Sequence, residues 1–398
     1  MLHFQQARNR ENLMEKKKIR IGMVGHRFMG AVHSQGWRVA PHFFDLPYDI
    51  ELAVVSGRNE EDVKDAAEKF GFQEWTTDWR SMLTRKDIDV IDICAPSDVH
   101  AEIAIEALNV GKHVLCEKPL ANNVDECESM SLAAENAFAK GVISMLGFNY
   151  RRVPAIQLAK SMVNSGKLGQ IRQARVQYLQ DWLRDENATM SWRLKKEIAG
   201  SGVLGDLGSH AVDTVQFVTG HKITSLTSHL QTFVSERPIS ASNLNVKDSV
   251  TVDDAAAFIA TTDKGGLVVI ETSRVATGRK NGLKMEVNGT KGSIYFDFED
   301  MNWLHFYDAE NEPNAGFEKI HVTENSHPYI KAWWPSGHSI GYEHPFTHQV
   351  VDLVYAIAEK SSPSPSFKEG LQVQQVLDAA ERSAESRTWE EVVAKQLV

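Results

Sequence analysis

A change in the pattern of apolar residues near residue 147 constrains what this chain can fold into more than any other feature. Before it, short β-branched runs alternate with segments of helical periodicity, and after it longer strand-like runs follow one another. Strands that alternate with helices form parallel sheets, whereas consecutive strands form antiparallel ones. The sequence therefore predicts an α/β domain with a doubly wound parallel sheet over 19–147, followed over 148–398 by an α+β domain with a large, mostly antiparallel open sheet.

Apolar runs and turn residues predict the individual strands, helices and loops of the two domains. An Asp-Lys-Gly-Gly turn at 263–266 between two strand-like runs predicts a hairpin. Residues 36–49 carry two prolines and are expected to form an insertion or extended loop, and residues 361–366 a loop. Residues 1–18 are interpreted as a polar leader or an extra surface helix. The predicted strands are 19–24, 50–56, 90–95, 113–116, 142–146, 171–180, 223–234, 254–261, 267–273, 284–288 and 292–297; the predicted helices are 29–39, 60–70, 100–109, 123–140, 345–359 and 371–388.

Composition excludes several classes of function. The 398 residues carry 43 − 53 = −10 formal charges, which argues against nucleic-acid or anionic-membrane partners. No apolar run approaches the roughly 18 residues that span a bilayer. The three cysteines, Cys94, Cys116 and Cys127, form no C-x-x-C pair, which predicts a protein of the reducing cytoplasm.

A glycine turn after the first strand predicts a phosphate site. Gly25 permits a tight turn and Gly30 close packing of the next helix, whose N-terminus would present free N–H groups to a pyrophosphate. Arg27 stands where a glycine is usual, and an ordinary strand–helix turn is the alternative interpretation. We expect Gly25, Arg27, Phe28 and Met29 to contact the cofactor.

The end of the second strand bears on which nicotinamide cofactor is bound. An acidic residue there would bind the ribose 2′-hydroxyl of NAD, but the chain has Ser56-Gly57-Arg58. A hydroxyl and a guanidinium suit a 2′-phosphate better. The pattern therefore slightly favours NADP(H) and leaves NAD(H) open; Arg58 stacked on adenine, or solvated, is the alternative.

Two further segments supply candidate catalytic groups. Lys118 follows the fourth strand, at the sheet edge where such folds bind ligands, although taken alone it would be a surface lysine. Asp206, His210 and Asp213 share one helical face, with His210 as the natural proton acceptor. Asp206 would bind a substrate hydroxyl or orient the base, and Asp213 would hold the other imidazole nitrogen. A capping aspartate with a core histidine, or a metal site, are the alternatives; we predict no metal.

These motifs resemble those of the Gfo/Idh/MocA oxidoreductases, the family of glucose–fructose oxidoreductase and the inositol dehydrogenases. The resemblance spans roughly 19–390 and rests on VGHRFMG (24–30), APSDVH (95–100), CEKP (116–119) and GSGVLGDLGSHAVD (200–213). It implies a Rossmann domain, an open-sheet domain, and NAD(P)-dependent oxidation of a secondary hydroxyl of a sugar, anhydrosugar, glycoside or cyclitol.

The resemblance also implies roles for individual residues. Lys118, Asp206 and His210 would be the catalytic set, with His210 as the base and Lys118 bonded to the reacting oxygen. These three would also bind substrate, with Asn149 and Arg151. The further residues implied to contact the cofactor are Ala95, Pro96, Ser97, His100, Glu117, Lys118, Trp192 and Arg193.

Some alternatives stay open at this stage. A nicotinamide-dependent glycoside hydrolase would need the same lysine and histidine, and a non-catalytic NAD(P)-binding regulator would need neither.

Segment 325–344, rich in aromatics and histidines, is either a substrate lid or, the preferred interpretation, a packed connecting loop or subunit contact. An apolar outer face on the second sheet would make the protein a homodimer or homotetramer.

Overall fold

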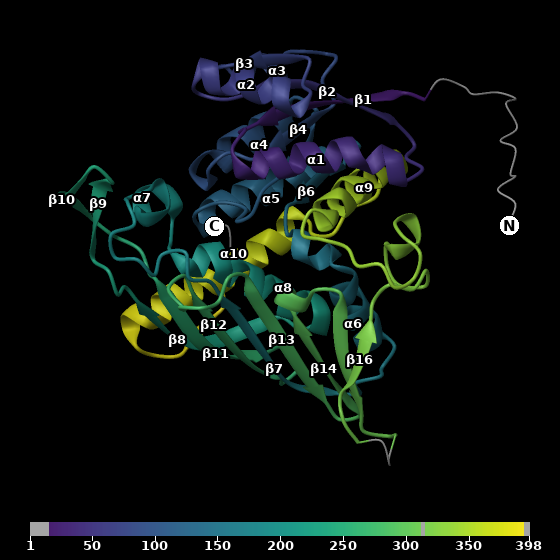
Figure 1. Cartoon of the computed structure of the whole chain (residues 1–398), viewed down its shortest axis with the longest axis vertical. Coiled ribbons are helices and arrows are strands. Elements are labelled where there is room, and N and C mark those ends of the chain that lie inside the picture. The colour runs from purple at the N-terminus through teal and green to yellow at the C-terminus, as the bar shows by residue number, and fades with distance from the viewer. Residues whose placement is uncertain (1–15, 312–314, 394–398) are drawn as a thin grey trace, which may run out of the picture.

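A parallel sheet forms the first layer of the protein. The computed structural model describes residues 16–311 and 315–393 (Figure 1), so most of the predicted leader lies outside the described residues. Six parallel strands run in the order β3-β2-β1-β4-β5-β6, the order of a doubly wound dinucleotide-binding sheet. Their bounds are β1 Lys18–Val24, β2 Asp49–Ser56, β3 Glu74–Thr76, β4 Val90–Ile93, β5 His113–Cys116 and β6 Ser144–Leu146. The predicted α/β class is confirmed; the half-exposed edge strand β3 was missed.

Helices cover both faces of this sheet. One face packs against α1 (Phe28–Phe43), α2 (Glu60–Phe70) and α9 (His344–Glu359), around buried Trp37 and Leu353. The other packs against α4 (His100–Asn109) and α5 (Val124–Phe138), around buried Ile103 and Met130. Helix α9 comes from the C-terminal part of the chain, which the sequence had placed wholly with the second sheet. The domain boundary at residue 147 therefore stays a prediction, because a helix from beyond it packs on the first sheet.

The expected insertion at 36–49 is mostly helix. Helix α1 continues to Phe43 with Pro41 inside its last turns, and only a short link remains before β2. Trp37 and Ala40 are fully buried on this extension, so their burial stabilises a helix that the two prolines seemed to exclude. A short helix, α3 (Arg80–Leu83), precedes β4.

The second layer is the predicted large sheet. Its nine strands run in the order β16-β15-β14-β13-β7-β12-β11-β8-β17, antiparallel except where β7 and β12 pair in parallel. The predicted hairpin joins β11 and β12. Bounds are β7 Ile171–Leu179, β8 Ile223–Gln231, β11 Ala255–Thr262, β12 Leu267–Ser273, β13 Gly282–Gly289, β14 Gly292–Asp297, β15 Trp303–Asp308, β16 Glu318–His321 and β17 Glu390–Glu391. The last three strands were not predicted, nor was the separate hairpin of β9 (Glu236–Ser240) and β10 (Asn243–Ser249).

Helices join the two sheets. Helices α6 (Pro154–Asn164), α8 (Ser209–Thr219) and α10 (Phe367–Ser386) lie on one face of the large sheet, and α10 also packs against α5 of the first layer. Figure 1 shows α10 and α9 at the junction between the layers. The carboxyl ends of β4 and β5 therefore meet the N-terminal end of α8, where the predicted catalytic residues lie. Within the described residues no helix is long and apolar enough to cross a membrane.

Candidate active site

The turn between β1 and α1 is built to receive a phosphate. Gly25 has φ of +100°, and a Cβ there would lie 2.6 Å from the Cys94 carbonyl, so only glycine fits. The 16-residue α1 has no side-chain cap and no acid in its first turn, and its free N–H groups suit an anion. Phe28 is 63% exposed beside this turn. These features fit the pyrophosphate of a dinucleotide.

The adenosine of a bound dinucleotide would lie at the end of β2. Ser56 is buried, and its carbonyl accepts a hydrogen bond from Gly25 N at 2.9 Å. Arg58 is exposed and has no ion pair or hydrogen bond within the part of the chain that the structure describes. Arg27 is also exposed, but its guanidinium pairs with Asp62 of α2 at 2.8 Å. Of these two arginines, Arg58 is therefore the one with no partner among the described residues.

The ends of β4 and β5 are fastened together by His100. The His100 ring lies 2.9 Å from the Ala95 carbonyl and 3.0 Å from that of Pro119, through its two nitrogens. Ser97 is buried in the turn before α4. His100 thus acts as a bridge between the two strand ends, next to Ala95 and Pro96.

Lys118 and Asp206 meet across the two layers. Lys118 Nζ donates to the Asp206 backbone oxygen at 3.0 Å and to its carboxylate at 3.1 Å. Burial opposes ionisation of Asp206, but the charges of Lys118, Arg274 and Arg193 outweigh it and lower its pKa to about 2. The lysine from the first layer and the aspartate from the second therefore form one charged pair.

His210 lies one turn after Asp206, inside an aromatic cage. Its ring centroid is 4.5 Å from that of Tyr150, 5.7 Å from Phe148 and 5.8 Å from Tyr178. Burial, and then the charge of Lys118, lower the pKa of His210 well below its usual range. His210 is therefore a neutral imidazole beside an ammonium group, the form that accepts a proton.

Buried polar atoms near this pair lack a partner within the described residues. Among them are Nδ1 of His210, Oγ of the adjacent Ser209, and Nδ2 of Asn149, which follows Phe148 of the cage. Unpaired buried polar groups are rare because they are costly, and they concentrate where a ligand or water binds. Trp192 and the exposed Arg193 stack on each other at the rim, where the charge of Arg193 reaches Asp206.

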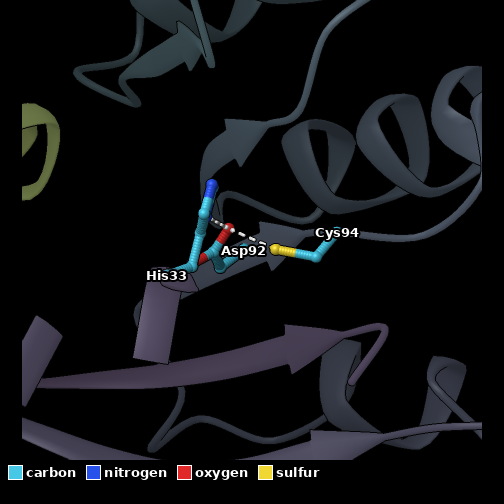
Figure 2. A group of neighbouring side chains, drawn as sticks. All are labelled: His33, Asp92 and Cys94. Atoms are coloured by element: carbon cyan, nitrogen blue, oxygen red, sulfur yellow. Dashed lines mark hydrogen bonds and ion pairs between the residues drawn. The ribbon is translucent and has the colours of Figure 1, made fainter. Parts of the chain in front are cut away.

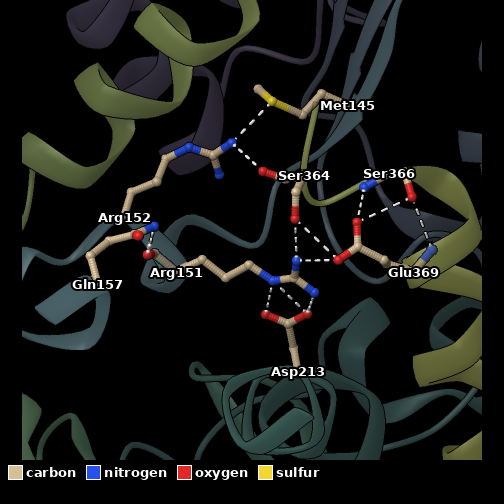
Figure 3. A network of polar contacts seen from close by, with 8 residues as sticks. All are labelled: Met145, Arg151, Arg152, Gln157, Asp213, Ser364, Ser366 and Glu369. Atoms are coloured by element: carbon tan, nitrogen blue, oxygen red, sulfur yellow. Dashed lines mark hydrogen bonds and ion pairs between the residues drawn. The ribbon is translucent and has the colours of Figure 1, made fainter. Parts of the chain in front are cut away.

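Arg151 and Asp213 bind each other, and their contacts differ from those predicted for them. Figure 3 shows that Arg151 Nε and Nη2 donate to Asp213, and Nη1 donates to Ser364 and Glu369. The prediction that Asp213 holds the His210 imidazole is therefore wrong. All three guanidinium nitrogens of Arg151 are engaged, so its contacts do not favour a role as a substrate ligand. Because Asp213 is on α8 and Glu369 caps α10, Arg151 instead fixes the helix that carries His210.

A second buried network lies beneath the ends of β4 and β5. His33, Asp92 and Cys94 (Figure 2) bring three potential metal-ligand atoms within 4.8 Å of one another. In this structure, however, the His33 ring bonds to Asp92 at 2.9 Å, and Trp37 Nε1 donates to Asp92 at 2.7 Å. We therefore interpret the cluster as a hydrogen-bonded network.

Several aromatic residues of the site were missed by sequence reasoning. Tyr150 and Tyr178 share a hydrogen bond of 2.7 Å behind His210, and Tyr342 lies between Phe28 and Phe298. Tyr342 belongs to segment 325–344. The segment also packs through Ile330, Trp333 and Ile340 against the end of α1, and its function stays a prediction. Asn149 and Arg151, which flank Tyr150, were the nearest signal.

At the carboxyl edge of its dinucleotide-binding sheet the chain therefore brings together a lysine, an aspartate and a neutral histidine, a combination that defines an NAD(P)-dependent oxidoreductase. Comparison with known families agrees. Residues 19–147 match the model of an oxidoreductase family with an NAD-binding Rossmann fold, and residues 156–295 match the GFO/IDH/MocA C-terminal domain. The chain belongs to the Gfo/Idh/MocA oxidoreductases, which act on CH–OH groups.

Individual relatives cover nearly the whole chain. Levoglucosan dehydrogenase of Pseudarthrobacter phenanthrenivorans is 37% identical over 94% of this chain and 98% of its own length. A solved levoglucosan dehydrogenase in complex with NADH and levoglucosan superposes with a TM-score of 0.91 at 38% identity, covering 95% of this chain and all of that one. An oxidoreductase domain protein from Kribbella flavida gives a TM-score of 0.92 at 56% identity over 95% of this chain and 100% of its own.

The Arg151 network predicts an effect on stability. Asp213→Asn removes one charge from a buried pair and leaves Arg151 partly uncompensated, so the free energy of unfolding should fall by about 3 kcal/mol. Urea denaturation monitored by circular dichroism measures this. The exposed Glu61→Gln should leave it unchanged, and an unchanged midpoint for Asp213→Asn would remove the network from the account of stability.

Proposed function

We propose that this protein oxidises a secondary hydroxyl of a sugar or 1,6-anhydrosugar with a nicotinamide cofactor. The observation that carries the proposal is the convergence of Lys118, Asp206 and a neutral His210 between the two layers. The cofactor, when bound, supplies the hydride acceptor. The relatives named for levoglucosan make that anhydrosugar the first compound to test.

The roles of the three residues follow from their charges. His210 takes the hydroxyl proton because its imidazole is neutral. Lys118 donates a hydrogen bond to the same oxygen and stabilises negative charge as it develops there. Asp206 orients the Lys118 ammonium and accepts a hydrogen bond from a neighbouring hydroxyl. Asn149, with its unpaired amide, is proposed as a second contact to the substrate.

This proposal predicts the behaviour of a His210 variant. His210→Asn removes the base, so kcat should fall by about 10²–10⁴-fold, while the dissociation constant of NADH stays nearly constant. Steady-state rates on levoglucosan, other monosaccharides and inositols, with NADH fluorescence titration, measure both. Near-normal kcat in this variant would contradict the assignment of the base.

The lowered pKa of His210 predicts the pH profile of the same reaction. A base with a pKa well below 6.5 stays neutral throughout the neutral range and is protonated only in acid. The acid limb of kcat/KM for oxidation should therefore lie clearly below pH 6.5. A limb centred near the ordinary histidine pKa would show that His210 is solvated, or is not the group that titrates.

The cofactor preference is a separate proposal. We propose that NADP(H) is accepted, because the strand end offers Ser56 and the unpaired Arg58 in place of an acid. Arg58→Ala should lower kcat/KM for NADP about tenfold, the loss of one charged hydrogen bond, and leave the value for NAD unchanged. A strong preference of the unaltered protein for NAD would end this proposal, and the solved relatives with NADH make both arms of the test necessary.

The outer face of the large sheet supports assembly into a homodimer or homotetramer. This face carries Ile259, Leu267 and Val269, which are 38–45% exposed on adjacent strands β11 and β12. Contiguous apolar surface of this kind is usually buried by a partner, here a second copy. Val269→Lys should shift the protein toward monomers in light scattering after size exclusion; an already monomeric protein would contradict the proposal.

The three free thiols suit the reducing cytoplasm proposed for this protein.

A further inference from the structure

His33 of α1 is held on both sides by carboxylates and has no part in the proposed chemistry. Its Nδ1 lies 2.9 Å from Asp92 Oδ1, and its Nε2 lies 3.0 Å from Glu117 Oε1. The side chains of His33 and Asp92 are fully buried and that of Glu117 is 5% exposed. The histidine thus joins α1 to the ends of β4 and β5.

The contacts fix the charge of this histidine. A neutral imidazole donates through one nitrogen only, whereas both carboxylates here need a donor. His33 is therefore an imidazolium: burial opposes this form, but the charge and hydrogen bond of Asp92 outweigh burial and raise the pKa of His33 well above its usual value. With two carboxylates and one cation, the triad of Asp92, His33 and Glu117 carries one net negative charge.

Glu117 is confined by its other neighbours as well. A Cβ on Gly147 would lie 2.5 Å from Glu117 Oε1, so the glycine makes room for the carboxylate. The backbone N of Glu117 donates to Ile93 at 2.9 Å. The next residue is Lys118, whose ammonium crosses to Asp206. Whatever fixes Glu117 therefore fixes the segment from which Lys118 extends.

The place of the triad in the sheet gives it a functional position. In a sheet of this order, a dinucleotide lies across the carboxyl ends with one mononucleotide over each half. The pyrophosphate turn follows β1, and Glu117 follows β5 in the other half of the sheet. Glu117 is therefore at the half that receives the nicotinamide end.

We infer that His33 is a positioning residue: it holds the Glu117 carboxylate in place as an anion and so anchors Lys118 at the nicotinamide end of the site. The inference rests on the proposed function of Lys118. It assigns to His33 no contact with substrate; His33 acts through Glu117.

The other groups around the triad limit what else can titrate there. Helix α9 contributes two uncharged side chains, Phe346 and Gln349, whose amide nitrogen lies 3.4 Å from His33 Nε2. Exchanging the nitrogen and oxygen of this amide turns its oxygen, which has no partner among the described residues, toward the His33 N–H. The two nearby thiols have pKa values raised by burial, as has the Tyr342 hydroxyl near Glu117, so all three stay neutral at neutral pH. Among the described residues, the titratable groups that interact with the triad are Cys94, Cys116 and Tyr342.

The test is a double-mutant cycle read by cofactor binding. Asn at position 33 cannot carry the charge, so in His33→Asn the buried Glu117 carboxylate is left without its cation. The uncompensated carboxylate then repels the anionic cofactor, and the dissociation constant of NADH should rise up to about tenfold, a change of about 1.4 kcal/mol in binding free energy. Glu117→Gln and the double variant should show no such rise, because neither has a carboxylate at position 117. His42→Asn, an exposed histidine of the same helix, is the matched control.

The outcomes separate this inference from the proposed function. A His33→Asn variant that binds NADH as tightly as the unaltered protein, or a double variant that keeps the weaker binding of His33→Asn, would overturn the inference, because the effect of a purely structural histidine would not depend on the Glu117 carboxylate. If His33→Asn fails to fold, ring carbon NMR shifts of His33 in the unaltered protein decide: an imidazolium across pH 6 to 9 supports the inference, and a neutral ring overturns it. If the unaltered protein oxidises no sugar, the proposed function is refuted. NADH binding can still be measured in that case, and it tests the role of His33 separately.

Discussion

The contact between Lys118 and Asp206 is the interaction on which the site depends. Lysine and aspartate come from different layers, so their pairing is possible only when the parallel sheet and the open sheet are docked. The pair also sets the electrostatics of its neighbour. Burial, and then the charge of this lysine, keep the neighbouring His210 neutral, while the same lysine helps to keep the aspartate ionised. An ionised carboxylate, a neutral imidazole and an ammonium group thus lie close together in one site.

Two buried ionic networks hold the two halves of this site. Arg151 ties α8 to the start of α10 behind His210, and His33 ties the ends of β4 and β5 behind Lys118. Buried charges are costly unless every partner is present, so such networks add little net stability compared with an apolar core. Their value lies in geometry, because breaking any one contact leaves a charge uncompensated. Each catalytic group is therefore backed by a structure that tolerates few alternative positions.

The sequence predicted the fold well where local pattern carries the information. Alternating strands and helices, the glycine turn and the β11–β12 hairpin all depend on neighbours in the chain, and each is present. The prediction was weakest where burial overrides local preference. Pro41 suggested a loop, yet α1 continues past it because Trp37 and Ala40 are buried against the sheet and α9. Helix α9 itself crosses back to the first layer, a contact that no local pattern shows.

The sequence by itself determined which chemical groups the site contains. The glycine turn, Lys118 after the fourth predicted strand, and Asp206 and His210 one helical turn apart are all readable from type and spacing. Only the tertiary structure decided what these groups do, because charge and hydrogen bonding depend on partners far away in the chain. Asp213 has the spacing to bind the His210 imidazole, but in the structure it binds Arg151 instead. His33 belongs to no motif in the sequence, yet it lies between two carboxylates from separate strands. Spacing fixes which face of a helix a side chain occupies, whereas the partner on that face is fixed by how the two layers pack.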